Sequence, residues 1–240
     1  MQRMIVCTSH LVALLVLLLP TSRVSAETVV IDYTFRGWYS QLGEHNSSNL
    51  NYIAGDLRGP GCDACLDDYR NFFIFDLAGI DQPIQSATLA LFVPGPPLPG
   101  YSSPYGKEAY ELHDVVTSLT KLRAGTGGVE AWTDLGSGVV YGVRSMTAAD
   151  SGSVIEITLN SSAIAALNAT TGRIGIGGSI TTLDGLPNNQ YVFGYTNSDT
   201  GTELTQLRLT LVPEPSCIAL AIFAVMIFSV SRSRAGYSAK

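Results

Sequence analysis

The sequence is poor in charged residues, cysteine, histidine and tryptophan. Of its 240 residues, 14% are charged, four are cysteine, three are histidine and two are tryptophan. So few charges, combined with 46% hydrophobic residues, exclude an intrinsically disordered chain, a collagen-like chain and a coiled coil. No internal repeat of about 20–50 residues is present, which argues against a propeller or a solenoid.

Signatures of catalysis and of cofactor binding are also missing. The sequence has no Gly-x-Ser-x-Gly elbow, no phosphate-binding loop and no dinucleotide fingerprint. Beyond the N-terminal segment the histidines are His45, in a polar stretch, and His113, in an alternating strand pattern. A Ser-His-Asp set would need one of these two. We therefore predict that the chain is not an enzyme, and a secreted hydrolase is the least favoured alternative.

The first apolar segment lies at the N-terminus, in residues 1–26. Arg3 gives it a positive start, residues 5–19 are mostly apolar, and Pro20 ends the run before a small-residue stretch that finishes at Ala26. This pattern predicts a signal peptide that signal peptidase removes after Ala26. An uncleaved anchor or a buried helix is the alternative, but the apolar run is too short to span a membrane comfortably.

The second apolar segment lies near the C-terminus. Residues 217–230 form an apolar run of 14 residues in which Ser229 alone is polar, followed by Arg232 and Arg234. As a helix this run extends about 21 Å, against roughly 30 Å for the hydrocarbon layer. We expect a short transmembrane helix whose basic end stays in the cytoplasm. A packed core helix is the alternative, but the run has no polar face to present to water.

Residues 27–212 are acidic and have the length of one domain. They contain 19 Asp and Glu against 9 Lys and Arg, a formal charge of −10. This balance disfavours nucleic acid as a partner. It suits solubility outside the cell or binding of divalent cations. A chain of this length buries about 70% of its unfolded surface in one core, so we expect a single ectodomain.

The hydrophobic pattern of the ectodomain is that of β-strands. Residues 86–93, 154–159 and 207–211 alternate with a period of two, whereas 72–75 are apolar on both faces, as in a central strand covered on both sides. Further strands are expected at 28–35, 109–113, 138–143, 173–177 and 191–195. One or two short helices are expected, at 115–123, capped by Asp114, and at 163–167, capped by Ser161 or Ser162. Strands in series, separated by turns, predict an all-β fold: an antiparallel β-sandwich that is jelly-roll-like.

The C-terminal residues 213–240 resemble a PEP-CTERM sorting signal of exported Gram-negative bacterial proteins. The resemblance rests on the motif Pro213-Glu214-Pro215, the short apolar run and the basic end, in that order. It implies recognition of the three motif residues by an exosortase, a membrane cysteine protease-transpeptidase that cleaves near the motif and releases or attaches the protein at the envelope. Independently, two prolines hold the backbone extended, which suits presentation to a protease.

The ectodomain is similar to a globular region that recurs in such exported proteins. The blocks that carry this likeness are 70–77 (RNFFIFDL), 84–89 (IQSATL), 134–138 (DLGSG) and 192–194 (VFG). The first two are also similar to the core of DNRLRE-type modules, which are jelly-roll sandwiches on bacterial surface proteins. Because the blocks are mostly strand and turn residues, the resemblance supports the fold more than any activity.

A cysteine pair with nearby aspartates is the main candidate binding site of the ectodomain. In an oxidising compartment Cys62 and Cys65 are expected to form a loop-closing disulfide; a redox dithiol and half a zinc site are the alternatives. Asp63, Asp67 and Asp68 beside them offer oxygen ligands for calcium, the one cofactor considered. The alternative is a solvated acidic loop, because the spacing matches no known calcium loop.

Trp38 and Trp132 are candidates for a platform on which sugar rings stack, and filling of the core is the alternative.

Taken together, these features predict an exported, non-enzymatic protein of the cell envelope or extracellular matrix, with a structural or adhesive role in biofilm or exopolysaccharide. A carbohydrate-binding module on the cell surface is the alternative. The expected partners are signal peptidase and exosortase as processing enzymes, exopolysaccharide as a ligand, and the membrane through the C-terminal helix before processing.

Overall fold

The computed structural model describes residues 26–57, 67–97, 100–186, 188–194 and 204–213. Glu27–Val212 forms a compact unit of its own. Every described core residue belongs to this unit, so the ectodomain carries its own hydrophobic core. The expected signal peptide and C-terminal apolar helix lie outside the described residues. In the described part of the chain, no helix has the length and apolar character needed to cross a membrane.

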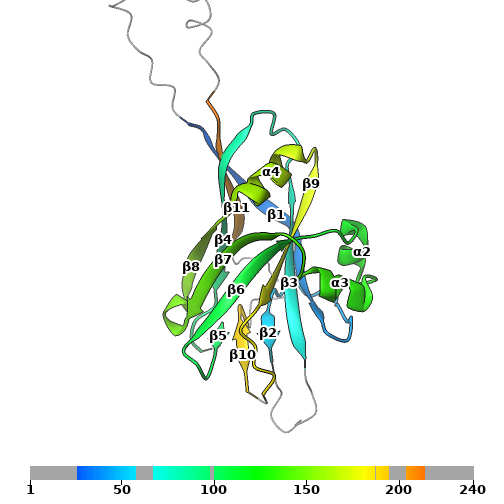
Figure 1. Cartoon of the computed structure of the whole chain (residues 1–240), viewed down its shortest axis with the longest axis vertical. Helices are drawn as coiled ribbons and strands as arrows, with labels where there is room; N and C mark the ends of the chain where they lie inside the picture. The colour runs from blue at the N-terminus through cyan, green and yellow to red at the C-terminus, as the bar shows by residue number, and fades with distance from the viewer. Residues whose placement is uncertain (1–25, 58–66, 98–99, 187, 195–203, 214–240) are drawn as a thin grey trace, which may run out of the picture. The chain divides into compact units, whose positions relative to one another are not determined.

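Strands dominate the described residues (Figure 1). The strands are β1 (Thr28–Ser40), β2 (Ala54–Asp56), β3 (Asp68–Asp76), β4 (Ile84–Val93), β5 (Tyr101–Ser102), β6 (Lys107–Asp114), β7 (Val140–Thr147), β8 (Ser153–Thr158), β9 (Arg173–Ile180), β10 (Gln190–Val192) and β11 (Thr205–Leu211). The helices are α2 (Leu119–Ala124), α3 (Gly128–Asp134) and α4 (Ser161–Ala169), with a 3-10 turn, η1 (Ala148–Asp150). Every pairing between described strands is antiparallel, which confirms the all-β prediction.

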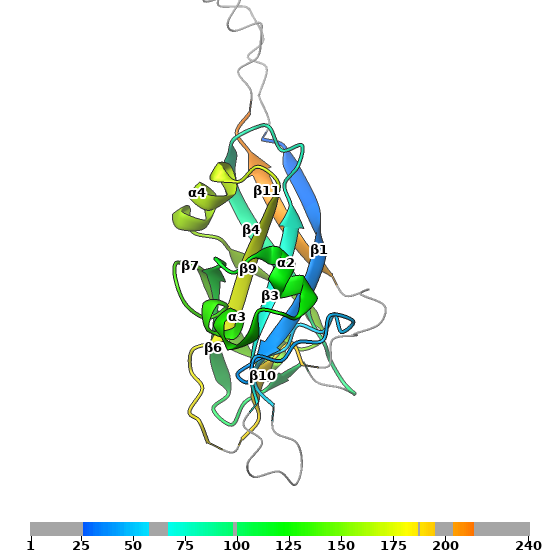
Figure 2. The ribbon, with the colours of Figure 1, turned by 90° about the vertical axis from the view of Figure 1, so that its right-hand side faces the viewer.

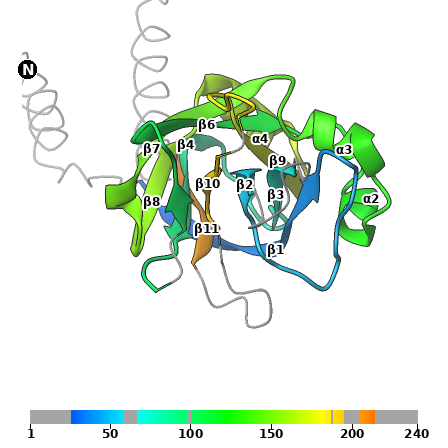
Figure 3. The same cartoon turned by 90° about the horizontal axis from the view of Figure 1, so that it is seen from below.

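One long strand, β1, joins the two arms of the curled sheet. Its first half pairs with β11, in the order β1-β11-β4-β8, and its second half pairs with β3. The register shifts between Tyr33 and Phe35, where a bulge turns the strand from one partner to the other. From β3 the sheet continues through β9 and β6 to β7. Figure 3 shows that the strands surround an interior instead of lying in one plane.

The interior is a single apolar core to which both arms contribute. Leu89 and Leu209 from one arm belong to the same buried cluster as Phe73, Ile176 and Leu112 from the other, and all are fully buried. Burial of each such side chain contributes about 1.5–3 kcal/mol. The alternation read from the sequence therefore faces this core, as expected for strands with one buried side.

Strand β3 is covered on both sides, as its doubly apolar sequence predicts. Phe73 and Phe75 point into the main core, whereas Phe72 and Ile74 belong to a second buried cluster. Residues of α2 and α3, among them Leu122, complete that cluster. Figure 2 shows both helices in front of the β3 and β9 strands. We call this side of β1, β3 and β9 the helix-covered face.

The helices differ from the expectation of one or two. Three α-helices occur among the described residues, and α3 was not expected. It starts at Gly128 behind an N-cap glycine, Gly127, and glycine is a poor helix former, so the stability of α3 comes from packing of Ala131 and Leu135 on the sheet.

Two expected helix caps were wrong. Asp114 does not cap a helix; its carboxylate accepts a hydrogen bond from the Val139 amide at 2.7 Å, and α2 starts later, at Leu119. In α4 the cap is Asn160, whose side chain accepts from the Ala163 amide at 3.1 Å, and not Ser161 or Ser162.

The two ends of the compact unit lie side by side. Thr28 at the start of β1 pairs with Thr210 near the end of β11, and the Leu211 amide donates to the Glu27 carbonyl at 2.9 Å. The ectodomain therefore begins and ends at the same end of its sheet.

Candidate functional site

The helix-covered face is built on glycines that let the helices approach the sheet. In the strand register Phe35 lies beside Ile74, and Ile74 lies beside Gly175. A Cβ on Gly175 would lie 2.8 Å from a Leu119 side-chain carbon, and one on Gly177 would lie 2.8 Å from the Leu135 carbonyl oxygen. Real side chains do not approach this closely. Glycine is therefore required at 177, where the neighbour is backbone, whereas at 175 a larger residue would force the Leu119 side chain to move.

A groove of about 530 Å³ opens where this face is left uncovered beside α2. Its apolar surface comes from Phe35, Ile74 and Leu119. Its polar groups come from Ser47, Thr120, Arg123 and Arg173. We call it the arginine groove.

The two arginines of the groove are held differently. The Arg123 guanidinium lies over the Phe35 ring, 5.3 Å from its centroid. Arg173 is 52% exposed, and its Nε lies 3.5 Å from the Asp76 carboxylate. An ion pair this exposed is weak. Both guanidinium groups therefore have N–H donors to offer a ligand.

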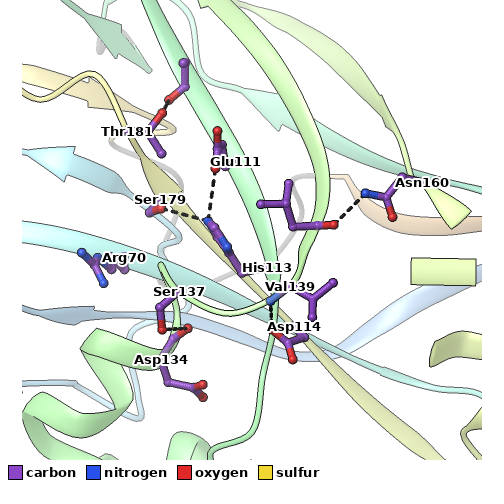
Figure 4. A network of polar contacts seen from close by, with 12 residues as sticks. Arg70, Glu111, His113, Asp114, Asp134, Ser137, Val139, Asn160, Ser179 and Thr181 are labelled. Carbon is purple, nitrogen blue, oxygen red and sulfur yellow. Dashed lines mark hydrogen bonds and ion pairs between the residues drawn. The ribbon is translucent and has the colours of Figure 1, made fainter. Parts of the chain in front are cut away.

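A second cluster of polar residues lies around His113, on the same side of the sheet as the arginine groove (Figure 4). His113 is buried, with Nε2 3.5 Å from the Ser179 hydroxyl and 3.7 Å from the Glu111 carboxylate. Its Nδ1 has no hydrogen-bond partner among the described residues. Burial lowers the pKa of His113, opposed by the nearby Glu111 carboxylate and reinforced by the Arg70 charge. The ring is therefore neutral near neutral pH.

The residue types of this group are those of a catalytic triad, but their geometry is not. In a triad the carboxylate bonds one ring nitrogen and the nucleophile bonds the other. Here the Ser179 hydroxyl and the Glu111 carboxylate both approach Nε2 of His113, at distances too long for strong hydrogen bonds. The arrangement does not activate Ser179.

Trp132 fastens α3 to β3. The Arg70 guanidinium carbon lies 3.8 Å from the centre of its ring, and Arg70 Nη1 donates to the carbonyls of Trp132 and Thr133, each at 3.0 Å. The Trp132 indole donates to the Asp68 carbonyl at 3.1 Å. One face of the Trp132 ring is thus occupied from within the domain.

Trp38 lies on the opposite side of the sheet from Trp132. It is partly buried and packs edge-on against Tyr69, with ring centres 5.1 Å apart. Its strand partner is Asn71, which donates from its amide to the buried Tyr52 carbonyl, whereas the next residue, Arg70, faces α3. Neighbouring strand residues face opposite ways. The structure therefore does not bring the two predicted tryptophans into one platform.

The predicted calcium and disulfide residues are described only in part. Cys62, Cys65 and Asp63 lie outside the described residues, and so do Glu214 and Pro215 of the sorting motif, whereas Pro213 is described and partly buried. No group of three or more potential metal ligands occurs within the described ranges.

Asp67 and Asp68 have separate surroundings. Asp67 accepts a hydrogen bond from the Tyr69 hydroxyl at 3.1 Å. Asp68 pairs across the strands with Asp56. Burial raises the pKa of Asp68 to about 6, with a counteracting effect from Arg70 and a smaller raising effect from Asp56.

The arginine groove was not predicted from the sequence. Its residues come from β1, α2 and β9 and from the loop after β1, so no local motif contains them. The sequence does not distinguish Arg123 and Arg173 from the other basic residues of the domain, because only the fold brings them to one groove. No protein-family model matches the chain, and no curated protein matches it significantly.

Proposed function

We propose that this chain is an exported, non-enzymatic protein of the cell envelope or extracellular matrix. Its C-terminal PEP-CTERM-like segment would be recognised by an exosortase, and residues 27–212 would be the part that acts after processing. The role we assign to that part is structural or adhesive, in a matrix of biofilm or exopolysaccharide. We also assign its curled sheet to the jelly-roll-like sandwiches of bacterial surface proteins.

The observation that carries the proposal is the pairing of the two ends of the ectodomain. Thr28 and Thr210 are partners in adjacent strands, so the domain can be held from one end by its C-terminal segment. Removal of the N-terminal segment at that same end would leave the rest of the fold untouched. This arrangement suits a domain displayed at the membrane through its C-terminal segment.

The geometry around His113 supports a non-enzymatic role. Since Ser179 and Glu111 approach the same ring nitrogen, this group lacks the relay that a serine hydrolase needs. A secreted hydrolase is accordingly the weakest of the candidate functions.

A carbohydrate-binding module is the second candidate, and the arginine groove is the observation that favours it. The groove combines an apolar surface with a few polar groups, as small-ligand sites do. Trp38 and Trp132 contribute less to this candidate than the sequence suggested, because each is packed separately within the domain.

The sorting proposal is tested by alanine substitution of Pro213, Glu214 and Pro215 together in the full-length chain, followed by fractionation of the native host. We expect the wild type to leave the inner-membrane fraction and the triple variant to remain there with its C-terminal segment intact. Alanine at Ser231 and Ser233, in the same segment but outside the motif, should leave sorting unchanged. Normal sorting of the triple variant would refute recognition through the motif.

A further inference from the structure

The arginine groove brings two exposed arginines, Arg123 and Arg173, to one cavity of a domain that is strongly acidic. The other described arginines are engaged within the domain, by hydrogen bonds or carboxylates: Arg36, Arg70, Arg144 and Arg208. Arg123, in contrast, makes no ion pair with a carboxylate among the described residues, and its guanidinium contacts the Phe35 ring. A charge left without an internal partner beside a cavity is suited to an external anion.

Phe35 prepares Arg123 for such an anion. A guanidinium over an aromatic ring is held by cation–π attraction while its N–H groups remain at the edge. The Phe35 ring is itself fixed, because it stacks on Phe72 with ring centres 6.0 Å apart and meets His45 edge-on at 6.3 Å. The contact with this ring restrains the exposed Arg123 side chain, which reduces the conformational freedom it loses when it binds a planar carboxylate through two hydrogen bonds.

The remaining groups of the groove match the rest of a sugar unit. Ser47 and Thr120 add hydroxyl groups, and the partly buried Leu119 adds apolar surface above the buried Ile74. Sugar rings present hydroxyl groups around their rim and C–H groups on their faces. A volume of about 530 Å³ lies within the range of small-ligand sites.

We propose that the arginine groove binds the carboxylate-bearing sugar units of an acidic polysaccharide. Arg123 takes the carboxylate through two N–H groups, Arg173 supplies a second cationic contact, and the partly exposed Phe35 and Leu119 pack against the sugar. This inference rests on the proposed function, which places the protein in contact with exopolysaccharide. The acidic remainder of the domain repels polyanions, so only the groove should contact the polysaccharide. The affinity should depend on the salt concentration.

The test measures binding of purified residues 27–212 to short oligogalacturonate by calorimetry at about 0.15 M salt. We expect saturable binding that Arg123→Ala weakens at least about tenfold, a loss of about 1.4 kcal/mol, because the variant removes a charge-assisted bidentate contact. Lys121→Ala is the matched control, because it removes the same charge from the same helix at a side chain outside the groove. It should change affinity less than about twofold. Circular dichroism checks that each variant is folded.

Three competing ligands decide the chemical class. The methyl ester of the same oligosaccharide, which lacks free carboxylates, should not bind. Polyglutamate and dextran sulfate should bind at least about tenfold more weakly than oligogalacturonate. Equal binding of either one, equal losses in Arg123→Ala and Lys121→Ala, or no binding of oligogalacturonate would each overturn the proposal. The measurement uses purified domain, so its failure leaves the sorting test unaffected, and failed sorting leaves this binding measurable.

Discussion

Replacing Arg36 with alanine should lower the free energy of unfolding of the ectodomain by about 3–5 kcal/mol. Arg36 is completely buried, although it is the most polar of the large core side chains. Its Nε donates to the Leu50 carbonyl at 2.9 Å and its Nη1 to the Thr205 hydroxyl at 2.7 Å. Its guanidinium also lies over two rings, 4.6 Å from the centre of Tyr33 and 4.5 Å from that of Tyr52.

The large effect follows from the position of Arg36 between the two arms of the sheet. It lies on β1, and Thr205 starts β11, so the side chain joins the two strands where β1 changes partner. Alanine would leave a cavity and two aromatic rings without their cation. It would also leave the buried Thr205 hydroxyl and the partly buried Leu50 carbonyl without a donor.

Urea unfolding of residues 27–212, followed by tryptophan fluorescence, measures this loss. Arg208→Ala is the control, because Arg208 pairs with Glu156 on the exposed side of the sheet, where removal should change stability by less than about 1 kcal/mol. A loss below about 1 kcal/mol for Arg36→Ala would contradict a role for this residue in holding the arms together.

Replacing Asp68 with asparagine should stabilise the ectodomain by about 2 kcal/mol near pH 8 and leave it nearly unchanged near pH 4. Burial raises the pKa of Asp68 to about 6 in the folded state, from 3.8 in a free side chain. The folded domain therefore binds more protons than the unfolded chain between these two values. Its stability falls as the pH rises through this window and stays reduced above it.

Asparagine has the same shape as aspartate and carries no charge at either pH, so it removes the cost of ionising a buried group beside Asp56. Thermal and urea unfolding at the two pH values give the difference. The exposed Asp81→Asn serves as the control and should change stability by less than about 0.5 kcal/mol at both. An equal effect of Asp68→Asn at both pH values would show that ionisation is not its cause.

Alternation in the sequence predicted most of the strands because burial decides their faces. The patterns at 207–211 and 154–159 match β11 and β8, and the doubly apolar 72–75 lies in β3, between a core and a helix layer. β1 runs on to Ser40, beyond the expected end at 35, because its second half finds a new partner in β3. Such a change of partner is a tertiary event that leaves no mark on the local pattern.

Elements whose stability is tertiary escaped prediction. α3 contains too few helix formers to be recognised, and it exists because Ala131 and Leu135 pack on glycine-lined strands. β2 lies in a stretch of turn residues, and its three residues are held by pairing with β3 and β10.

The candidate site was not predictable from the sequence. The sequence predicted a sugar-stacking platform of Trp38 and Trp132, but the two side chains lie on opposite sides of the sheet. The arginine groove draws Phe35, Arg123 and Arg173 from three distant segments. Calcium binding near Asp63 and a disulfide between Cys62 and Cys65 stay predictions.

The processed protein should consist of the ectodomain, residues 27–212, without the two apolar terminal segments. The most direct test is the mass of the native protein recovered from envelope and culture-medium fractions. Mass spectrometry should find a chain that starts at Glu27 and ends close to the Pro213–Pro215 motif, with or without an attached group there. Recovery from the cytosol of the complete 240-residue chain, with both apolar segments retained, would contradict the account.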